Sequence, residues 1–306
     1  VAQVVAPALP VVSRIVRALH EPLAVRSEGE PAVVLTFAGT DPTSGAGIQA
    51  DLLTLASLGC HAVSVVTAVT VQDTAGVSVV VPLDARLVAA QANTLLADMS
   101  VAVFKIGLIG SAENAHAIGA ILAAHPDVPV VLDPVLASGR GDPLADEALL
   151  DAMRQQILPR ATIVTPNSIE ARRLARAPEG QTYEFAASAS AADYARAIVA
   201  DGAQYVLVTG THDDTVVVSN RLFDVQGEIR TDAWTRLEGS YHGSGCTLAS
   251  AVAALLANGL SVPQAVLEAQ EYTWQALAHG IRPGRAQAIP DRLFWARHAG
   301  AAVATH

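Results

Sequence analysis

A glycine-rich segment before an apolar run is the part of this sequence best suited to binding an anion. Residues 242–247 read His-Gly-Ser-Gly-Cys-Thr, and the apolar run Leu248–Ala257 follows directly. Glycines at the start of a helix let backbone N–H groups converge on an anion, and the helix N-terminus adds partial positive charge. We expect an anion hole over Gly243, Ser244 and Gly245. Cys246 falls in the expected first turn, where the pKa of a thiol is usually lowered, although a small buried cysteine in a tight turn would show the same pattern.

Two carboxylates and an amide have the chemistry of a magnesium site beside a nucleotide. Asn167 and Glu170 follow Pro166 at the expected start of a helix, and Asp133 follows the apolar run 128–132. Carboxylate and amide oxygens are ligands that Mg²⁺ accepts next to substrate phosphates. The same Asn-x-x-Glu spacing fits a capping box, in which both side chains bond to the helix N-terminus. The spacing alone leaves both interpretations open.

Asp51 and Gln72 are candidate contacts to a polar heterocycle. Asp51 lies among the apolar residues of an expected helix at Ile48–Leu58. A carboxylate on that inward face costs several kcal/mol unless it finds a partner, so we expect it to contact a ligand. Gln72 ends an expected strand, where it could present its amide edge to a heterocycle or be a solvated turn residue.

Apolar β-branched runs alternate with helical periodicity from Pro31 onward. The expected strands are Val33–Ala38, Ala62–Val69, Ala102–Ile106, Pro129–Leu132, Thr162–Thr165, Tyr205–Val208 and Thr215–Val218. The other expected helices are Ala85–Asp98, Ala115–Ala124, Ala145–Ile157, Ile169–Ala175 and Ala187–Ala200. This alternation indicates an α/β fold with a mostly parallel sheet covered on both sides. We also expect an antiparallel hairpin within residues 215–224 that turns at Ser219-Asn220.

Polar and glycine residues follow several of the expected strands. They include Gly39, Asp133, Asn167, Thr209 and Gly210. Ligands of open α/β folds bind beyond the carboxyl ends of the strands, so we expect these residues to meet at one edge of the sheet. Each of them alone is also typical of an ordinary turn.

The charge composition excludes several classes of protein. The 306 residues carry 19 Lys and Arg against 29 Asp and Glu, and Lys105 is the only lysine. Its surroundings fit neither a Walker-type phosphate loop nor a Schiff-base site. A net charge of −10 without a basic cluster argues against a nucleic-acid partner. The longest apolar stretch, 248–260, is too short to cross a bilayer.

The chain length fits one or two domains, and no segment has the composition of a linker. We expect one domain over residues 31–306, preceded by an extension over residues 1–30. The extension begins with apolar residues but lacks the cationic stretch that opens a secretory signal. Two cysteines without metal-ligand spacing favour a cytoplasmic protein.

Six segments in this order resemble the hydroxymethylpyrimidine/phosphomethylpyrimidine kinases of thiamine biosynthesis. They are residues 39–51, 69–77, 105–107, 131–135, 165–170 and 242–247. The most specific are Asp-Pro-x-x-Gly-Ala-Gly-Ile-Gln-Ala-Asp, which ends at Asp51, and Gly-x-Gly-Cys-Thr, which ends at Thr247. The resemblance covers roughly residues 33–280. It implies a ribokinase-like fold, a three-layer α/β/α arrangement with a central, mostly parallel sheet.

The resemblance also implies roles for individual residues. Pyrimidine contacts fall on Gly39, Asp51 and Gln72, and the anion hole falls on Gly243 to Cys246. Metal and phosphate contacts fall on Asp133, Glu170, Asn167, Thr209, Gly210 and Arg140. Cys246 stands where many ribokinase-like enzymes have an aspartate base, and it would accept or relay the proton of the substrate hydroxyl. The implied reaction is the phosphorylation of 4-amino-5-hydroxymethyl-2-methylpyrimidine with ATP and Mg²⁺, and then of its monophosphate, by a homodimer.

Two departures from the family pattern affect expected phosphate contacts. Residues 208–212 read Val-Thr-Gly-Thr-His where the family usually has Val-Lys-Gly-Gly-His, and residues 139–142 read Gly-Arg-Gly-Asp where a flap commonly reads Lys- or Thr-Ser-Gly-Asp. Arg140 could replace a flap cation because arginine binds phosphate through two N–H groups. The alternatives are a pyridoxal kinase, since some of these share Gly-x-Gly-Cys, and a noncatalytic pyrimidine-binding homologue. Asp51 and Gln72 favour an aminopyrimidine substrate.

Overall fold

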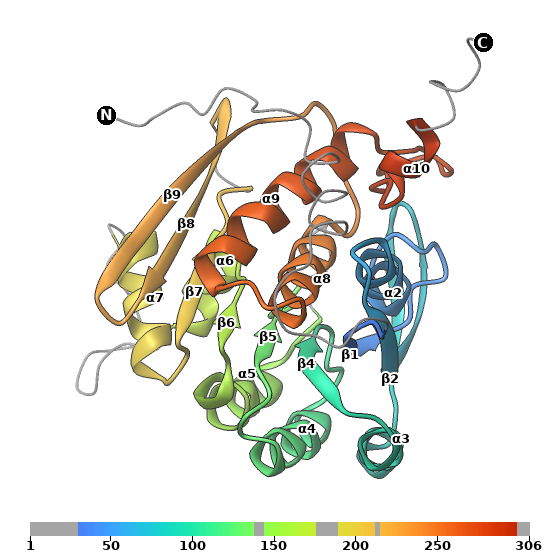
Figure 1. Cartoon of the computed structure of the whole chain (residues 1–306), viewed down its shortest axis with the longest axis vertical. Helices are drawn as coiled ribbons and strands as arrows, with labels where there is room; N and C mark the ends of the chain where they lie inside the picture. Colours follow the sequence, from blue (N-terminus) through green and yellow to red (C-terminus); the bar gives the residue numbers. More distant parts are fainter. Residues whose placement is uncertain (1–29, 138–143, 176–188, 212–214, 299–306) are drawn as a thin grey trace.

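A single sheet of nine strands forms the centre of the part of the chain that the structure describes. This computed structural model describes residues 30–137, 144–175, 189–211 and 215–298. The strands are β1 (Val33–Gly39), β2 (His61–Asp73), β3 (Gly76–Pro82), β4 (Val101–Ile106), β5 (Val130–Leu132), β6 (Ile163–Val164), β7 (Tyr205–Val208), β8 (Val217–Asp224) and β9 (Gly227–Thr235). Their order is β3-β2-β1-β4-β5-β6-β7-β8-β9 (Figure 1). The strands from β2 to β7 in this order pair in parallel, and β3, β8 and β9 extend the two edges antiparallel.

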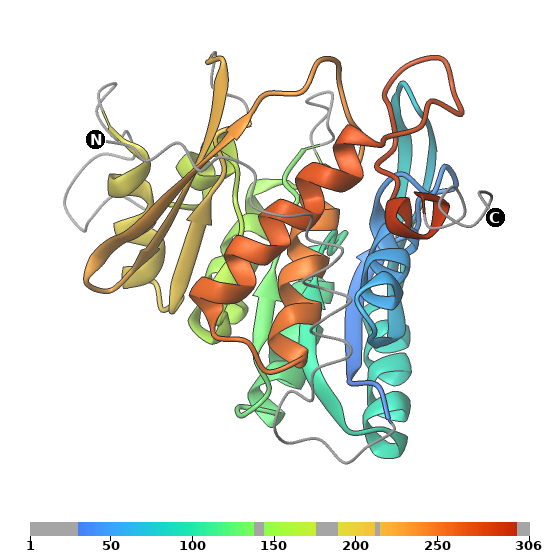
Figure 2. The same cartoon turned by 45° about the horizontal axis from the view of Figure 1, so that its top comes forward.

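Helices cover both faces of the sheet, which confirms the predicted three layers. One apolar cluster lies between the sheet and α2 (Gly47–Ser57), α8 (Ser244–Ala257) and α9 (Val262–Ala278). The other lies under α3 (Ala85–Asp98), α4 (Ala112–Ala124), α5 (Glu147–Gln156), α6 (Ser168–Leu174) and α7 (Ala191–Ala200). A 3-10 turn, Leu158–Arg160, follows α5, and the short α10 (Phe294–His298) ends the described chain. Figure 2 shows α8 and α9 side by side in front of the sheet. None of the described helices has the length and apolar character that a membrane span requires.

The two sheet edges differ most from the sequence-based expectation. The predicted turn at Ser219-Asn220 is wrong, because both residues lie inside β8 and the chain turns between Asp224 and Gly227. Asn220 is tolerated within a strand because its side chain is fully engaged: Nδ2 donates to Gln270 Oε1 at 2.8 Å, and Oδ1 accepts the N–H of Gly210 at 3.1 Å. A partner on α9, 50 residues away, leaves no periodic signal in the sequence.

The opposite edge is a hairpin that the sequence analysis missed. Strand β2 continues to Asp73 and turns into β3, which was not predicted. The carboxylate of Asp73 accepts the N–H of Ala75 at 2.7 Å and that of Gly76 at 3.2 Å, which closes the turn. The tip of this hairpin meets the segment after α9, where Arg285 pairs with Asp73 at 3.1 Å. Figure 2 shows the hairpin beside that segment, which is drawn in red.

A buried ion pair joins the elements on the α8 side of the sheet. Thr36 of β1 and Lys105 of β4 are neighbours in register, and both side chains are fully buried. The Nζ of Lys105 lies 2.9 Å from each carboxylate oxygen of Asp51 on α2. Thr36 Oγ1 donates to the same carboxylate at 2.6 Å, and Ser250 Oγ of α8 donates to it at 2.8 Å. Asp51 therefore ties α2 to β1, β4 and α8 through one carboxylate.

Lys105→Met should destabilise the fold strongly, because it leaves the carboxylate of Asp51 buried without its cation. Removing one partner of a buried ion pair typically costs about 3–5 kcal/mol. Asp51→Asn keeps the shape of the side chain but leaves the ammonium group of Lys105 buried without a counter-charge. We therefore expect a loss of stability of similar size. Urea denaturation followed by circular dichroism gives both free energies of unfolding.

The matched control is Arg86→Met, which breaks the exposed pair between Arg86 and Asp84 at 3.0 Å. Exposed pairs contribute about 1 kcal/mol or less, so this variant should unfold like the unmodified protein. Equal stabilities of the Lys105 and Arg86 variants would refute the structural role of the buried pair.

Candidate active site

The predicted site residues converge at the point where the strand order of the sheet reverses. Strand β1 lies between β2 and β4, so the chain runs outward from it in both directions, and open α/β sheets bind ligands at such a point. A cavity of about 910 Å³ lies there. The predicted residues that line it are Gly39, Gln72, Asp133, Asn167, Glu170, Thr209, Gly243, Ser244, Gly245 and Cys246. The expected meeting of these segments at one sheet edge is thus observed, while the role of each residue stays a prediction.

The N-terminus of α8 opens into this cavity with its backbone donors available. The residue before the helix is Gly243, which has a left-handed φ of 81°, and no side chain in the described structure caps the helix. A β-carbon on Gly243 would overlap the carbonyl oxygen of Gly45, so only glycine allows this close approach of the two loops. Because the first N–H groups of a helix have no partner within the helix itself, this end can receive an anion, as the sequence predicts.

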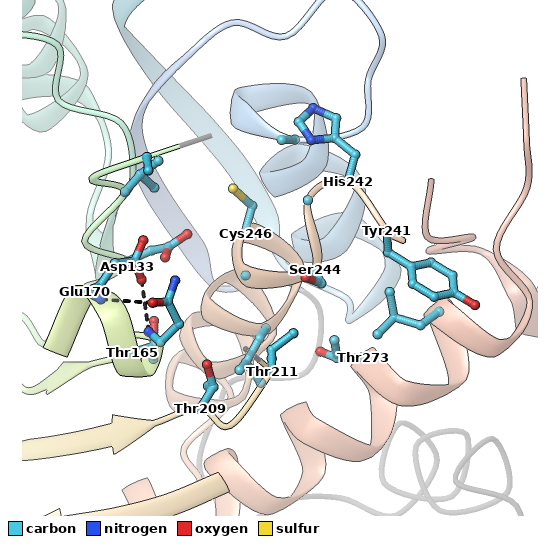
Figure 3. Close-up of a pocket in the computed structure, with 18 of the residues that line it drawn as sticks. Asp133, Thr165, Glu170, Thr209, Thr211, Tyr241, His242, Ser244, Cys246 and Thr273 are labelled. Atoms are coloured by element: carbon cyan, nitrogen blue, oxygen red, sulfur yellow. Dashed lines mark hydrogen bonds between the residues drawn. The ribbon is translucent and has the colours of Figure 1, made fainter. Parts of the chain in front are cut away.

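Cys246 lies in the first turn of α8, partly exposed to the cavity. Asp133 lies beside this turn, since a β-carbon on Gly245 would be 3.7 Å from its Oδ1, and Gly47 lines the same part of the cavity. Figure 3 shows the sulfur at the end of α8 on the side that faces Asp133 and Glu170. The expectation of a lowered thiol pKa is wrong. Surrounding protein and the charge of Asp133 raise the pKa of Cys246 to about 12, and the nearby cation of Lys105 does not offset this.

Asp133 and Glu170 lie together on the other side of the cavity. Burial raises the pKa of Asp133 above its ordinary value, against the opposing charge of Lys105. Burial and the neighbouring charge of Asp133 raise the pKa of Glu170 to about 8. The capping-box interpretation of the Asn-x-x-Glu motif is confirmed, because Glu170 and Asn167 form such a box at the start of α6. Both residues also line the cavity, so the magnesium interpretation stays a prediction.

The same two carboxylates fit a bound Mg²⁺ ion. The Oδ2 of Asp133 is buried and has no hydrogen-bond partner among the described residues, and Asp133 lies close enough to Glu170 for its charge to raise the pKa of Glu170. A cation between them would satisfy the free oxygen and relieve the repulsion. In the described part of the chain no three His, Cys, Asp or Glu side chains form a complete metal cage. Mg²⁺ does not require one, because it is usually held by one or two carboxylates together with water and substrate phosphates.

Two predicted site residues do not line the cavity, and a third cannot be placed because it lies outside the described residues. Asp51 needs a partner, as the sequence argument states, but it finds Lys105, Thr36 and Ser250 inside the protein, so the structure does not support its expected contact with substrate. Gly210 lies behind the cavity wall with its N–H bonded to Asn220. Arg140 lies outside the described residues.

Three cations that line the cavity were not predicted as site residues from the sequence: Lys105, Arg173 and Arg236. Lys105 lines the cavity floor, and the signal for it was available, because a lone lysine in a buried strand requires a carboxylate and Asp51 is a carboxylate on an apolar helix face. Arg236 lines the cavity near Thr211, and its guanidinium donates to the carbonyl oxygens of Thr215 at 2.6 Å and Thr211 at 2.9 Å. An arginine after an edge strand gives no comparable signal.

Comparison with known sequences decides the family. The sequence model described as phosphomethylpyrimidine kinase matches residues 41–291. The chain belongs to the phosphomethylpyrimidine kinase family. It is 38% identical over 258 residues to the hydroxymethylpyrimidine/phosphomethylpyrimidine kinase of Streptomyces coelicolor, covering 83% of this chain and 91% of that protein. It is 36% identical to the Escherichia coli enzyme of the same name over 257 residues, or 81% of this chain and 95% of that protein.

Solved structures share the fold of this family member. The Staphylococcus aureus pyridoxal kinase in complex with pyridoxal matches with a TM-score of 0.77 and 30% identity, covering 88% of this chain and 96% of that one. Phosphomethylpyrimidine kinase from Clostridium difficile matches with a TM-score of 0.65 and 30% identity, covering 79% and 97%. Both support the ribokinase-like fold inferred from the sequence motifs.

The raised pKa of Glu170 predicts a pH-dependent stability of the metal-free protein. A carboxyl whose pKa is about 8 when folded and about 4.5 when unfolded binds its proton more tightly in the folded state. Its contribution to stability is therefore full below about pH 4.5 and is lost as the pH rises towards 8. Glu170→Gln keeps the capping box but removes the titration.

The measurement is the free energy of unfolding of both proteins in the presence of a chelator at several pH values. The stability of the unmodified protein should fall relative to that of Glu170→Gln between about pH 5 and pH 8. A difference that stays constant over this range would contradict the assigned environment of Glu170.

Proposed function

We propose that this protein transfers a phosphoryl group from ATP to the hydroxymethyl group of 4-amino-5-hydroxymethyl-2-methylpyrimidine, and then phosphorylates the monophosphate to the diphosphate. The observation that carries the proposal is the placement of Cys246 and Asp133 in one cavity beside the open N-terminus of α8. The names of the sequence relatives support the choice of substrate.

Each end of the cavity would bind one part of the substrates. Gln72 lines the end of the cavity towards the β2–β3 hairpin. Its Nε2 donates a hydrogen bond to Thr70 Oγ1 at 2.9 Å, which fixes the orientation of the amide. An amide offers a donor and an acceptor side by side, which suits the ring nitrogen and amino group of an aminopyrimidine. The N–H groups of Gly243 to Cys246 would receive the transferred phosphoryl group, whose charge is greatest on its peripheral oxygens.

The proton of the substrate hydroxyl would leave through Cys246 and Asp133. A thiol with a pKa of about 12 is a poor base by itself. It can relay a proton, because it lies in the same cavity as the carboxylate of Asp133, which can accept that proton. Phosphoryl transfer passes through a loose transition state, so the positions of the groups matter more than the strength of the base.

Asp133, Glu170 and the amide of Asn167 would hold Mg²⁺ near the phosphates of ATP. When bound, the ion neutralises phosphate charge that the single lysine of this chain does not reach, since Lys105 is committed to Asp51. Thr209, and Arg140 outside the described residues, remain the proposed phosphate contacts in place of the family lysine. A homodimer and a cytoplasmic location also remain predictions.

Product analysis tests the proposed reaction. We expect the purified protein to convert the pyrimidine alcohol to its monophosphate and, when supplied separately, the monophosphate to the diphosphate, with ATP consumed in equal amount. Pyridoxal is the comparison substrate, because pyridoxal kinases are among the structural neighbours. Faster turnover of pyridoxal would replace the proposed substrate, and binding of the pyrimidine without ATP turnover would identify a noncatalytic homologue.

The relay predicts that Cys246→Ala lowers kcat by about 100-fold, the lower end of the effect of positioned proton-transfer groups. Cys246→Ser should retain more activity, since a hydroxyl can also donate to Asp133. Cys60→Ala is the matched control, because Cys60 is buried against α8 and does not line the cavity. Steady-state kinetics that give Cys246→Ala and Cys60→Ala the same kcat would exclude the relay.

A further inference from the structure

Arg292 is a buried cation that lies just after the segment matched by the family model. Only 3% of its surface is exposed, and each nitrogen of its guanidinium has an acceptor. Nη1 donates to the carbonyl oxygen of Ser44 at 3.1 Å and Nη2 to that of Gly45 at 2.5 Å, while Nε donates to Thr247 Oγ1 at 3.1 Å. Arg292 thus joins the loop between β1 and α2 to the first turn of α8.

The backbone of Arg292 is anchored independently of this guanidinium. Its carbonyl oxygen accepts hydrogen bonds from Ser57 Oγ at 2.7 Å and Tyr272 Oη at 2.8 Å. The following residues continue into α10, where Phe294 packs beside Tyr272. Loss of the side chain would therefore leave the C-terminal segment in place and release the loop alone.

The loop held by Arg292, residues 41–47, forms one wall of the anion hole. Its last residue, Gly47, lines the cavity together with Cys246. The carbonyl oxygen of Gly45 sits where a β-carbon of Gly243 would be. The contacts of Arg292 form one clamp on this loop, and those of Asp41 form a second. Asp41 accepts the N–H of Ala46 at 2.7 Å and lies 2.9 Å from Nε2 of His242.

The two clamps are not equivalent. The Asp41 contact joins loop residues to each other and to the residue before Gly243. Arg292 also places a fixed positive charge close to Cys246, Asp51 and Asp41. Thr247, which accepts from Arg292, also donates its hydroxyl to the carbonyl oxygen of Gly243 at 2.7 Å. The guanidinium therefore contacts both sides of the junction on which the helix N-terminus depends.

We propose that Arg292 is a positioning residue that holds the β1–α2 loop against the N-terminus of α8 and so keeps the anion hole and the Cys246 thiol in register for phosphoryl transfer. The catalytic half of this inference rests on the proposed function. Arg292 does not line the cavity, so it contributes through the loop and the helix and makes no substrate contact.

Arg292→Met tests the proposal by removing the hydrogen bonds while retaining much of the side-chain volume. Misplacement of reacting groups by about 1 Å can lower the rate about 100-fold, so we expect kcat to fall roughly 100-fold. The KM values for ATP and pyrimidine should stay within about threefold, because no lining residue changes. Arg292→Lys should recover part of kcat, since it restores the charge but cannot reach three acceptors at once.

A second measurement tests, without any substrate, whether Arg292 holds the loop. Hydrogen–deuterium exchange of a peptide covering residues 42–48 should accelerate in Arg292→Met, while exchange in α3 stays unchanged. Arg297→Met is the matched control, because it removes a mostly exposed arginine that pairs with the buried Asp291 at 2.7 Å in the same C-terminal segment. It should alter neither kcat nor the exchange of residues 42–48.

The exchange rate and kcat together distinguish failure of the positioning role from failure of the proposed function. Unchanged exchange and unchanged kcat in Arg292→Met would overturn the positioning role. A fall in kcat that Arg297→Met reproduces, or that matches the unfolded fraction in urea denaturation, would also overturn it. Faster exchange of residues 42–48 in a protein whose unmodified form phosphorylates no pyrimidine would support the clamp and reject the proposed function.

Discussion

The structure around the cavity depends on one buried ion pair, Asp51 with Lys105. Both carboxylate oxygens of Asp51 contact Nζ of Lys105, and the carboxylate also accepts from two hydroxyl groups. These partners lie on β1, β4 and α8. Ser250, the donor on α8, lies four residues after Cys246, so the two side chains share a face of that helix. The pair therefore sets the depth and rotation of α8 and places the thiol opposite Asp133. It also uses the only lysine of the chain inside the fold, as the partner of Asp51.

This use of the lysine affects how phosphate charge can be managed. Burial would lower the pKa of Lys105, but the charges of Asp51, Cys246 and Asp133 keep it above its ordinary value, so the site holds a permanent internal cation. Two further carboxyls, Asp133 and Glu170, have pKa values that burial raises despite the charges of Lys105 near the first and Arg173 near the second. A site of this kind suits a divalent ion and backbone N–H donors. It does not suit a mechanism that depends on a strongly basic thiol.

The sequence predicted the layers of the fold and most of the cavity wall, because both follow from local signals. Apolar periodicity marked the parallel strands, and the glycines at 243 and 245 marked the open helix end. The errors concern long-range contacts. Burial of the Cys246 thiol, together with the charge of Asp133, reverses the pKa shift expected from its helix position alone. Asn220 is bonded to Gln270 on α9, so an asparagine that looks like a turn residue in the sequence lies inside a strand. Asp51 is satisfied by Lys105, 54 residues away, which removes the need for a ligand.

The central claim is that the N-terminus of α8 is where the phosphoryl group passes to the substrate hydroxyl beside Cys246. A crystal structure with the pyrimidine alcohol, a non-hydrolysable ATP analogue and Mg²⁺ tests it most directly. The account predicts terminal phosphate oxygens on the N–H groups of Gly243 to Cys246 and the substrate hydroxyl roughly 3–3.5 Å from the Cys246 sulfur, a distance typical of groups poised to react. A pyrimidine bound with its hydroxyl turned away from Cys246, or a terminal phosphate far from α8, would contradict it.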